Sequence, residues 1–238
     1  MLRVPDASRS LTRHRLTMLS LVLVAIATQS GWSTDVAVPT EVDRIEEDWS
    51  LLLGEPDVEN DSPQILNVIS PFGTTEGEHA IFELNHCTQP EYLSGGLQLQ
   101  RWTGPDTCVA TTRTIDRGTL AIPAEEITYT MRMTLRDGTL YYSVRNGTSQ
   151  TWGTFGDYGQ YRLSVPTTAT TLSGYRPDFS ATESKVSFGS HRVKTFKIKQ
   201  IRYYSLGKLV ATDSTERVVH QYDATSAEAT IPVVEETP

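Results

Sequence analysis

Three consecutive acidic residues, Glu46, Glu47 and Asp48, are the first group in the sequence whose chemistry could serve catalysis. In an extended strand successive side chains point to opposite faces, so Glu46 and Asp48 would share one face. Retaining glycoside hydrolysis needs two carboxyl groups about 5 Å apart, one as nucleophile and one as acid. The strand supplies no further acid at the required place. The pattern therefore favours the solvated edge of a first strand, and we predict no catalytic residue.

A second acidic group, Asp57, Glu59 and Asp61 with Asn60 beside them, could offer oxygen ligands to Ca²⁺. Its spacing resembles the start of an EF-hand loop. The central glycine of that loop is absent, however, and no glutamate stands at the closing position. A solvated acidic loop is the favoured interpretation, with a Ca²⁺ site as the alternative.

The segment from Gly147 to Gly159 combines glycines with aromatic residues, and it is the main candidate for a ligand site. Glycine lets backbone approach a ligand closely, and an aromatic face can stack on a sugar ring. The candidate ligand-binding residues are Trp152, Phe155, Asp157 and Tyr158. The alternative is that Trp152 and Phe155 close one end of the fold. Tyr158 is the preferred stacking residue, because its setting is more polar and its hydroxyl favours a half-exposed position.

A basic patch is predicted late in the chain, where Arg192, Lys194, Lys197, Lys199 and Arg202 follow one another. Such a patch could bind an acidic glycan. Lysines and arginines on the outer face or edge of a sheet more often maintain solubility and prevent aggregation.

Sequence signatures of common enzyme classes are absent. The histidines have no zinc-ligand spacing, and there is no nucleophile elbow, P-loop or dinucleotide-binding fingerprint. We therefore expect no cofactor, apart from the Ca²⁺ alternative above.

The stretch from Tyr129 to Val144 predicts the fold class. Apolar and polar residues alternate on both sides of Asp137-Gly138, which is the signal for a type I′ hairpin turn. A two-residue loop would pair apolar residues with one another, namely Leu135 with Leu140, Met133 with Tyr142 and Met131 with Val144. A sheet with one polar face is typically antiparallel, so we predict an all-β chain.

Further short strands with turn signals between them favour a single antiparallel β-sandwich over residues 34–222. We expect strands over 45–53, 64–70, 80–85, 96–102, 108–115 with a continuation over 118–122, 160–165, 193–205, 208–213 and 216–222. The apolar pattern of 193–205 shifts phase, which indicates a β-bulge or a strand buried on both faces. Residues 167–182 are expected to be a long polar connection, and 223–238 an acidic flexible tail.

The N-terminus has the features of a secretory signal peptide. Arginines precede a short apolar run that ends in Ala25-Ile26-Ala27, a pattern typical of a cleavage site. We assign residues 1–33 to this signal and expect the mature chain in the periplasm, at the cell surface or outside the cell. No integral membrane span is expected after cleavage, because no other apolar run is long enough.

The assigned signal peptide determines the expected net charge of the mature chain and the expected state of its cysteines. Removing residues 1–33 takes four arginines and one aspartate from 21 basic and 29 acidic residues, which leaves a net charge of −11. This acidity argues against nucleic acid or an anionic membrane as the main partner. An exported chain meets an oxidising compartment, so we predict a disulfide between Cys87 and Cys108.

The strand order, with "MTLRDGTLYYSV", "NGTSQTWGTFG" and "FKIKQIRYYSLGKLV", resembles a concanavalin A-like jelly roll of the laminin-G and lectin type. The stretches "VDRIEEDWSLLLGEPD" and "ELNHCTQPEYLSGGLQLQ" resemble an uncharacterised family of secreted planctomycete proteins. Glycanases of this fold carry Glu-x-Asp-x-x-Glu on one strand. Glu46 and Asp48 match its first two places, but Leu51 stands at the third.

Three functions remain open from the sequence. The favoured one is an exported, non-enzymatic module that binds carbohydrate or a surface protein. A structural protein of the cell envelope without a small ligand is the second. The third is a glycan-active hydrolase of the concanavalin-like class.

Overall fold

The hairpin predicted at Asp137-Gly138 is present, with the predicted register, in the computed structural model. Strands β7 (Glu126–Arg136) and β8 (Thr139–Ser149) are antiparallel and pair Leu135 with Leu140, Met133 with Tyr142 and Met131 with Val144. Asp137 and Gly138 have φ angles of 50° and 67°, as a type I′ turn requires. The six paired apolar side chains are at most 9% exposed. Turn chemistry and burial therefore specify the same register.

The structure describes residues 39, 41–56, 62–86, 94–113 and 115–222. Several predictions fall outside these ranges: the signal peptide over 1–33, the acidic tail over 223–238, the Ca²⁺ alternative at Asp57, Glu59 and Asp61, and Cys87 of the predicted disulfide. Cys108 is described, and its exposed side chain forms no disulfide in the structure. The predicted bond to Cys87 is therefore not supported.

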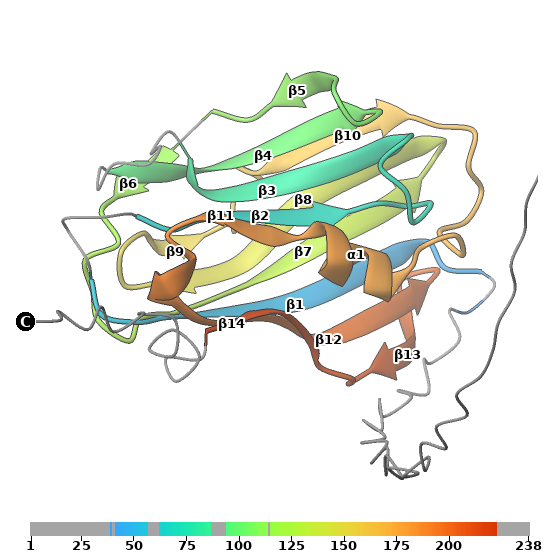
Figure 1. The fold of residues 1–238 in the computed structure, drawn as a ribbon. Helices are drawn as coiled ribbons and strands as arrows, with labels where there is room; N and C mark the ends of the chain where they lie inside the picture. Colours follow the sequence, from blue (N-terminus) through green and yellow to red (C-terminus); the bar gives the residue numbers. More distant parts are fainter. Residues whose placement is uncertain (1–38, 40, 57–61, 87–93, 114, 223–238) are drawn as a thin grey trace, which may run out of the picture. The chain divides into compact units, whose positions relative to one another are not determined.

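The larger sheet contains eight of the described strands, all paired antiparallel. Its order is β10 (Arg162–Pro166), β8, β7, β1 (Arg44–Leu53), β12 (Val193–Ser205) and β13 (Lys208–Asp213). In addition, β14 (Arg217–Gln221) pairs with β12, and β9 (Gly153–Phe155) pairs with β8. β1, the first of the described strands, therefore lies in the middle of the sheet, between β7 and β12 (Figure 1).

The smaller sheet contains six of the described strands, and its order is β11 (Lys185–Phe188), β2 (Gln64–Ile69), β3 (Glu78–His86), β4 (Gly95–Thr103) and β5 (Cys108–Thr111), with β6 (Ile115–Gly118) also on β4. The two sheets form separate layers, which Figure 1 shows. The strand predicted over 108–115 is in fact two short strands, β5 and β6, and residues 119–122 do not continue it.

Two short helices were missed in the sequence. Helix α1 (Pro177–Glu183) lies in the connection that was expected to be only polar, and the single-turn 3₁₀ helix η1 (Ser190–Arg192) precedes β12. Seven residues are too few to show a helical apolar period. Helix α1 packs against β2 and β14, so it covers one edge of the space between the sheets.

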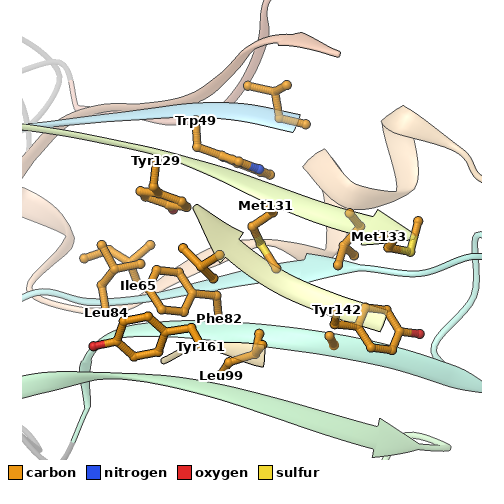
Figure 2. Packing of buried hydrophobic residues seen from close by; sticks show 14 of the residues in the cluster. Trp49, Ile65, Phe82, Leu84, Leu99, Tyr129, Met131, Met133, Tyr142 and Tyr161 are labelled. Carbon is orange, nitrogen blue, oxygen red and sulfur yellow. The ribbon is translucent and has the colours of Figure 1, made fainter. Parts of the chain in front are cut away.

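The hydrophobic core fills the space between the two layers (Figure 2). Aromatic rings from both sheets meet there: Phe82 of β3 lies 5.3 Å from Tyr129 of β7 and 5.6 Å from Tyr161, between ring centroids. Trp49 of β1 stacks on Phe196 of β12 at 5.0 Å. Two antiparallel sheets that enclose one core confirm the predicted all-β sandwich.

The phase shift predicted in β12 is a β-bulge. The pairing with β1 changes between Asp48, opposite Gln200, and Trp49, opposite Ile198. Lys199 is the extra residue between them, and its side chain is exposed. A bulge of this kind lets Ile198 and Ile201 both enter the core while Gln200 faces outward.

Candidate functional site

The acidic strand β1 is a central strand, so the prediction of a solvated edge is wrong. Its alternation places Ile45, Glu47, Trp49, Leu51 and Leu53 in the core, each 0% exposed. Glu46 and Asp48 lie on the opposite, open face of the larger sheet. Position in a sheet depends on which distant strands pair with β1, and the sequence of β1 does not contain that information.

Glu46 is held by basic and hydroxyl groups from neighbouring positions on the open face, and Arg44 Nε lies 3.6 Å from its Oε1. Its Oε1 lies 2.6 Å from Arg132 Nη2 of β7, and its Oε2 lies 3.2 Å from Arg202 Nη2 of β12. The hydroxyl of Tyr204 donates to Oε2 at 3.0 Å. Although it is on an open face, the Glu46 residue is only 4% exposed. Its neighbours therefore fix the carboxylate as an ion-paired acceptor.

Asp48, two residues further along β1, receives three hydrogen bonds. Thr130 Oγ1 donates to Oδ1 at 2.8 Å, Gln200 Nε2 donates to Oδ2 at 2.7 Å, and Arg202 Nη2 donates to Oδ1 at 2.7 Å. Arg202 thus bridges Asp48 and Glu46. The result is an ordered network of carboxylate, guanidinium, amide and hydroxyl groups on β1, β7 and β12.

A pocket of about 440 Å³ adjoins this network. Strands β1, β7 and β12 supply most of its wall, and β8 and the segment before β14 supply the rest. Its polar lining includes Asp48, Thr130, Asn146, Lys199, Gln200 and Glu216. The bulge in β12 contributes both Lys199 and Gln200, so the phase shift seen in the sequence shapes the wall of this pocket.

The Gly/aromatic segment divides into a buried half and an exposed half. Trp152 is 7% exposed, and its indole Nε1 donates to the carbonyl oxygen of Gly95 at 3.2 Å. Phe155 is 1% exposed and packs against Phe82. These two rings belong to the core and cannot stack on a ligand. Tyr158 is 91% exposed, and Asp157 is also exposed, so these two of the four candidates are accessible.

The exposed half of this segment lies against β8. Gly156 has a φ of 86°, and a Cβ atom there would lie 2.6 Å from the carbonyl oxygen of Val144 and 3.0 Å from Cα of Arg145. Only glycine allows so close an approach. The chain that carries Asp157 and Tyr158 therefore passes beside the part of β8 that bears Arg145.

Glu125 organises the start of the Gly/aromatic segment, and sequence reasoning missed it. This buried carboxylate accepts bonds from Ser149 Oγ at 2.5 Å, from the Thr151 backbone N–H at 2.8 Å and from Thr151 Oγ1 at 2.6 Å. Ser149 Oγ in turn accepts a bond from the Trp152 N–H at 3.0 Å. A single glutamate before a strand gives no sequence signal for this role.

The five basic residues predicted to form one patch do not all lie together, although Lys197, Lys199 and Arg202 lie around the pocket at Asp48 and Glu216. Arg192 is 1% exposed, and its Nη1 donates to the carbonyl oxygen of Leu120 at 2.9 Å inside the protein. Lys197 pairs with Glu216 at 2.9 Å, and Arg202 pairs with Asp48. Lys194 lies outside the pocket that Lys199 lines. The prediction failed because η1 and the bulge change which residues face outward.

Glu47 is the one acidic residue of the β1 triplet that enters the core. Trp49 Nε1 donates to Oε2 at 2.9 Å, and the Tyr175 hydroxyl donates to Oε1 at 2.6 Å. Burial raises the pKa of the Glu47 carboxyl to about 7, although these hydrogen bonds and Ser180 act in the opposite direction. Glu47 is 0% exposed, so its role is inside the fold.

Neither a metal-binding cluster nor a membrane-spanning helix occurs within the described ranges. No group of three or more His, Cys, Asp and Glu side chains there is arranged to hold a metal ion. None of the helices in those ranges is long and apolar enough to cross a membrane.

The fold and site define an all-β sandwich with an ordered polar pocket on the open face of its larger sheet. No protein-family model, curated protein or solved structure matches the chain. The resemblance to concanavalin A-like jelly rolls and to the planctomycete family therefore stays a prediction.

Proposed function

We propose that this protein is an exported, non-enzymatic module that binds carbohydrate on the open face of the larger sheet. The observation that carries this proposal is the ordered network around Asp48, beside a pocket of about 440 Å³. The exported location rests on the sequence of residues 1–33. The concanavalin A-like class, which includes many lectins, is consistent with this function.

The chemistry of the pocket suits sugar hydroxyls, which donate and accept hydrogen bonds at once. Asp48 offers carboxylate acceptors, Lys199 offers donors, and Asn146 and Gln200 offer both. Gln200 and Asp48 are already fixed to each other at 2.7 Å. Less side-chain entropy is lost on binding when the binding groups are already ordered.

The same observation favours binding over hydrolysis. Asp48 receives three donors, and Glu46 lies within ion-pair distance of arginines on both neighbouring strands. A carboxylate surrounded in this way is a fixed acceptor, whereas a general acid needs a proton to give. Leu51, at the third place of the glycanase pattern, is 0% exposed in the core.

We expect Gln200→Ala to weaken binding of a glycan about tenfold, or about 1.4 kcal/mol. Gln200 lines the pocket, and its loss would remove a hydrogen-bonding group and one of the three donors that hold Asp48. The purified protein would first be screened on a glycan array, and the best ligand would then be titrated by calorimetry.

Gln100→Ala is the matched control for this experiment. Gln100 is half-buried like Gln200, and its Nε2 donates to Glu83 Oε2 at 2.7 Å, but it lies on the outer face of the smaller sheet. Gln200→Ala removes the bond to Asp48, and Gln100→Ala removes bonds to Glu83, Gln98 and Trp102. The control should therefore lose at least as much stability as Gln200→Ala, which should lose about 1–2 kcal/mol. Equal affinity of the two variants for the glycan would contradict the proposed site.

A further inference from the structure

Arginines recur in two adjacent rows of residues that cross the open face of the larger sheet. The strand register crosses the larger sheet in a row that pairs Arg162 of β10 with Ser143 of β8, Ser143 with Arg132 of β7, Arg132 with Glu46 of β1, and Glu46 with Arg202 of β12. Three of the five residues in this row are arginines. The whole chain, in contrast, has a net charge of −8.

The next row adds a fourth arginine. It pairs Arg145 of β8 with Thr130 of β7, Thr130 with Asp48 and Asp48 with Gln200. The two rows together hold four arginines and two carboxylates. The carboxylates, Glu46 and Asp48, lie in the middle of the sheet, so the positive charge is in excess on the β8 and β10 side.

Arg145 and Arg162 are the two arginines in excess. Arg132 and Arg202 form ion pairs with Glu46 and Asp48. Within the described ranges no carboxylate lies at ion-pair distance from Arg145 or Arg162. The guanidinium carbon of Arg162 lies 4.4 Å from the centroid of the Tyr141 ring, which holds it over the sheet.

Arg132 shows that these charges are close enough to act on one another. Burial lowers the pKa of its guanidinium, the carboxylate of Glu46 opposes that effect, and the positive charges of Arg145 and Arg44 lower the pKa further. Like charges on neighbouring strands are destabilising. An anion placed among these side chains would remove the repulsion.

We propose that Arg145 and Arg162 bind the anionic group of an acidic sugar, a carboxylate or a sulfate, at the β8 and β10 end of the open face. This inference rests on the proposed function. Guanidinium groups recognise such planar or tetrahedral oxyanions with two parallel hydrogen bonds. Ser143 is the register partner of Arg162 and precedes Arg145 by two residues on β8, and Tyr158 lies in the exposed segment that passes beside Arg145.

An acidic glycan fits these observations better than a nucleic acid does. The positive excess is local to one end of the sheet, and the chain as a whole is acidic, so duplex DNA, with one negative charge per about 1.7 Å of its length, would meet repulsion elsewhere on the protein. A glycan with one charge per sugar unit can place single anionic groups at the arginines and neutral hydroxyls at the Asp48 pocket.

The test compares two doubly substituted proteins by calorimetry. One carries Arg145→Gln with Arg162→Gln. The control carries Arg113→Gln with Arg117→Gln, which removes the same charge from two exposed arginines outside the larger sheet. Each protein and the parent are titrated with polygalacturonate, dextran sulfate, neutral dextran and duplex DNA, at low and at physiological salt. Gln200→Ala is included as the probe of the proposed function.

We expect the parent to bind polygalacturonate or dextran sulfate about tenfold or more tightly than dextran, with an affinity that falls as salt rises. The Arg145/Arg162 variant should lose most of this preference and keep its affinity for neutral glycan, and the control should match the parent. Whether polygalacturonate or dextran sulfate binds more tightly identifies the anionic group.

Four results would overturn the inference. The control could lose as much affinity as the Arg145/Arg162 variant, or DNA could bind as tightly as the glycans, and then only general charge attraction acts. Alternatively, a neutral glycan could bind as tightly as the anionic ones in a way that depends on Gln200, which would leave the proposed function standing without the anionic site. Absence of binding to every polysaccharide would overturn both.

Discussion

The variant Glu47→Gln is expected to remove a pH dependence of stability of about 3 kcal/mol between pH 4.5 and pH 7. The folded protein buries the Glu47 carboxyl completely, and this burial raises its pKa from 4.5 to about 7. Each unit of difference between folded and unfolded pKa corresponds to about 1.36 kcal/mol. A glutamine has the shape of the protonated acid and does not titrate.

The direction of this effect follows from proton binding. Between pH 4.5 and pH 7 the unfolded chain has released the Glu47 proton, while the folded chain still holds it. The folded state therefore binds more protons in this window, and the free energy of unfolding falls as the pH rises. The contribution of protonated Glu47 to the free energy of unfolding is fully present below pH 4.5, and it is completely lost above about pH 7.

Urea unfolding of the parent and of Glu47→Gln at several pH values between 4 and 8 would measure this difference. Glu76 is exposed, and Glu76→Gln is the control. Its plot of unfolding free energy against pH should run parallel to that of the parent. If the curve of Glu47→Gln is also parallel to the parent, Glu47 is not the buried titrating group that its contacts with Trp49 and Tyr175 indicate.

Trp152→Ala and Tyr158→Ala should separate the buried and exposed halves of the Gly/aromatic segment. Removing the buried indole should cost about 3–5 kcal/mol of stability and leave the carbonyl of Gly95 without its donor. Tyr158 is 91% exposed, so its removal should change stability by less than about 0.5 kcal/mol. Thermal or urea unfolding of both variants measures this contrast.

The same pair also tests the ligand candidates. If Tyr158 stacks on a sugar, Tyr158→Ala should weaken glycan binding by about 1–2 kcal/mol without loss of stability. A strongly destabilised Tyr158→Ala protein would show that this side chain is structural. Unchanged binding by a stable Tyr158→Ala protein would remove the loop from the site and leave the pocket at Asp48.

The features that were predicted correctly are those that short stretches of sequence determine. The Asp137-Gly138 turn and the alternation around it specify one register, and the structure has that register. The phase shift in β12 indicated a bulge or a strand buried on both faces, and the structure has a bulge with Lys199 as the extra residue. Among the aromatic residues, size and setting distinguished the buried Trp152 from the exposed Tyr158.

The features that were missed depend on residues far apart in the sequence. Glu47 and Tyr175, which share a hydrogen bond, are 128 residues apart. Glu46 is ion-paired because β7 and β12 both lie next to β1, and the order of strands in a sheet is not written in any one strand. The acidic triplet is therefore visible in the sequence, but its central place in the larger sheet and its arginine partners are not.

Mapping of amide chemical shifts during a glycan titration tests the central claim most directly, because it reports where the sugar binds without any substitution. With isotope-labelled protein and a glycan found on the array, the account predicts the largest shifts at Asp48, Thr130, Asn146 and Gln200 on the larger sheet. Shifts concentrated instead at Gln100 and Trp102, on the outer face of the smaller sheet, would contradict it.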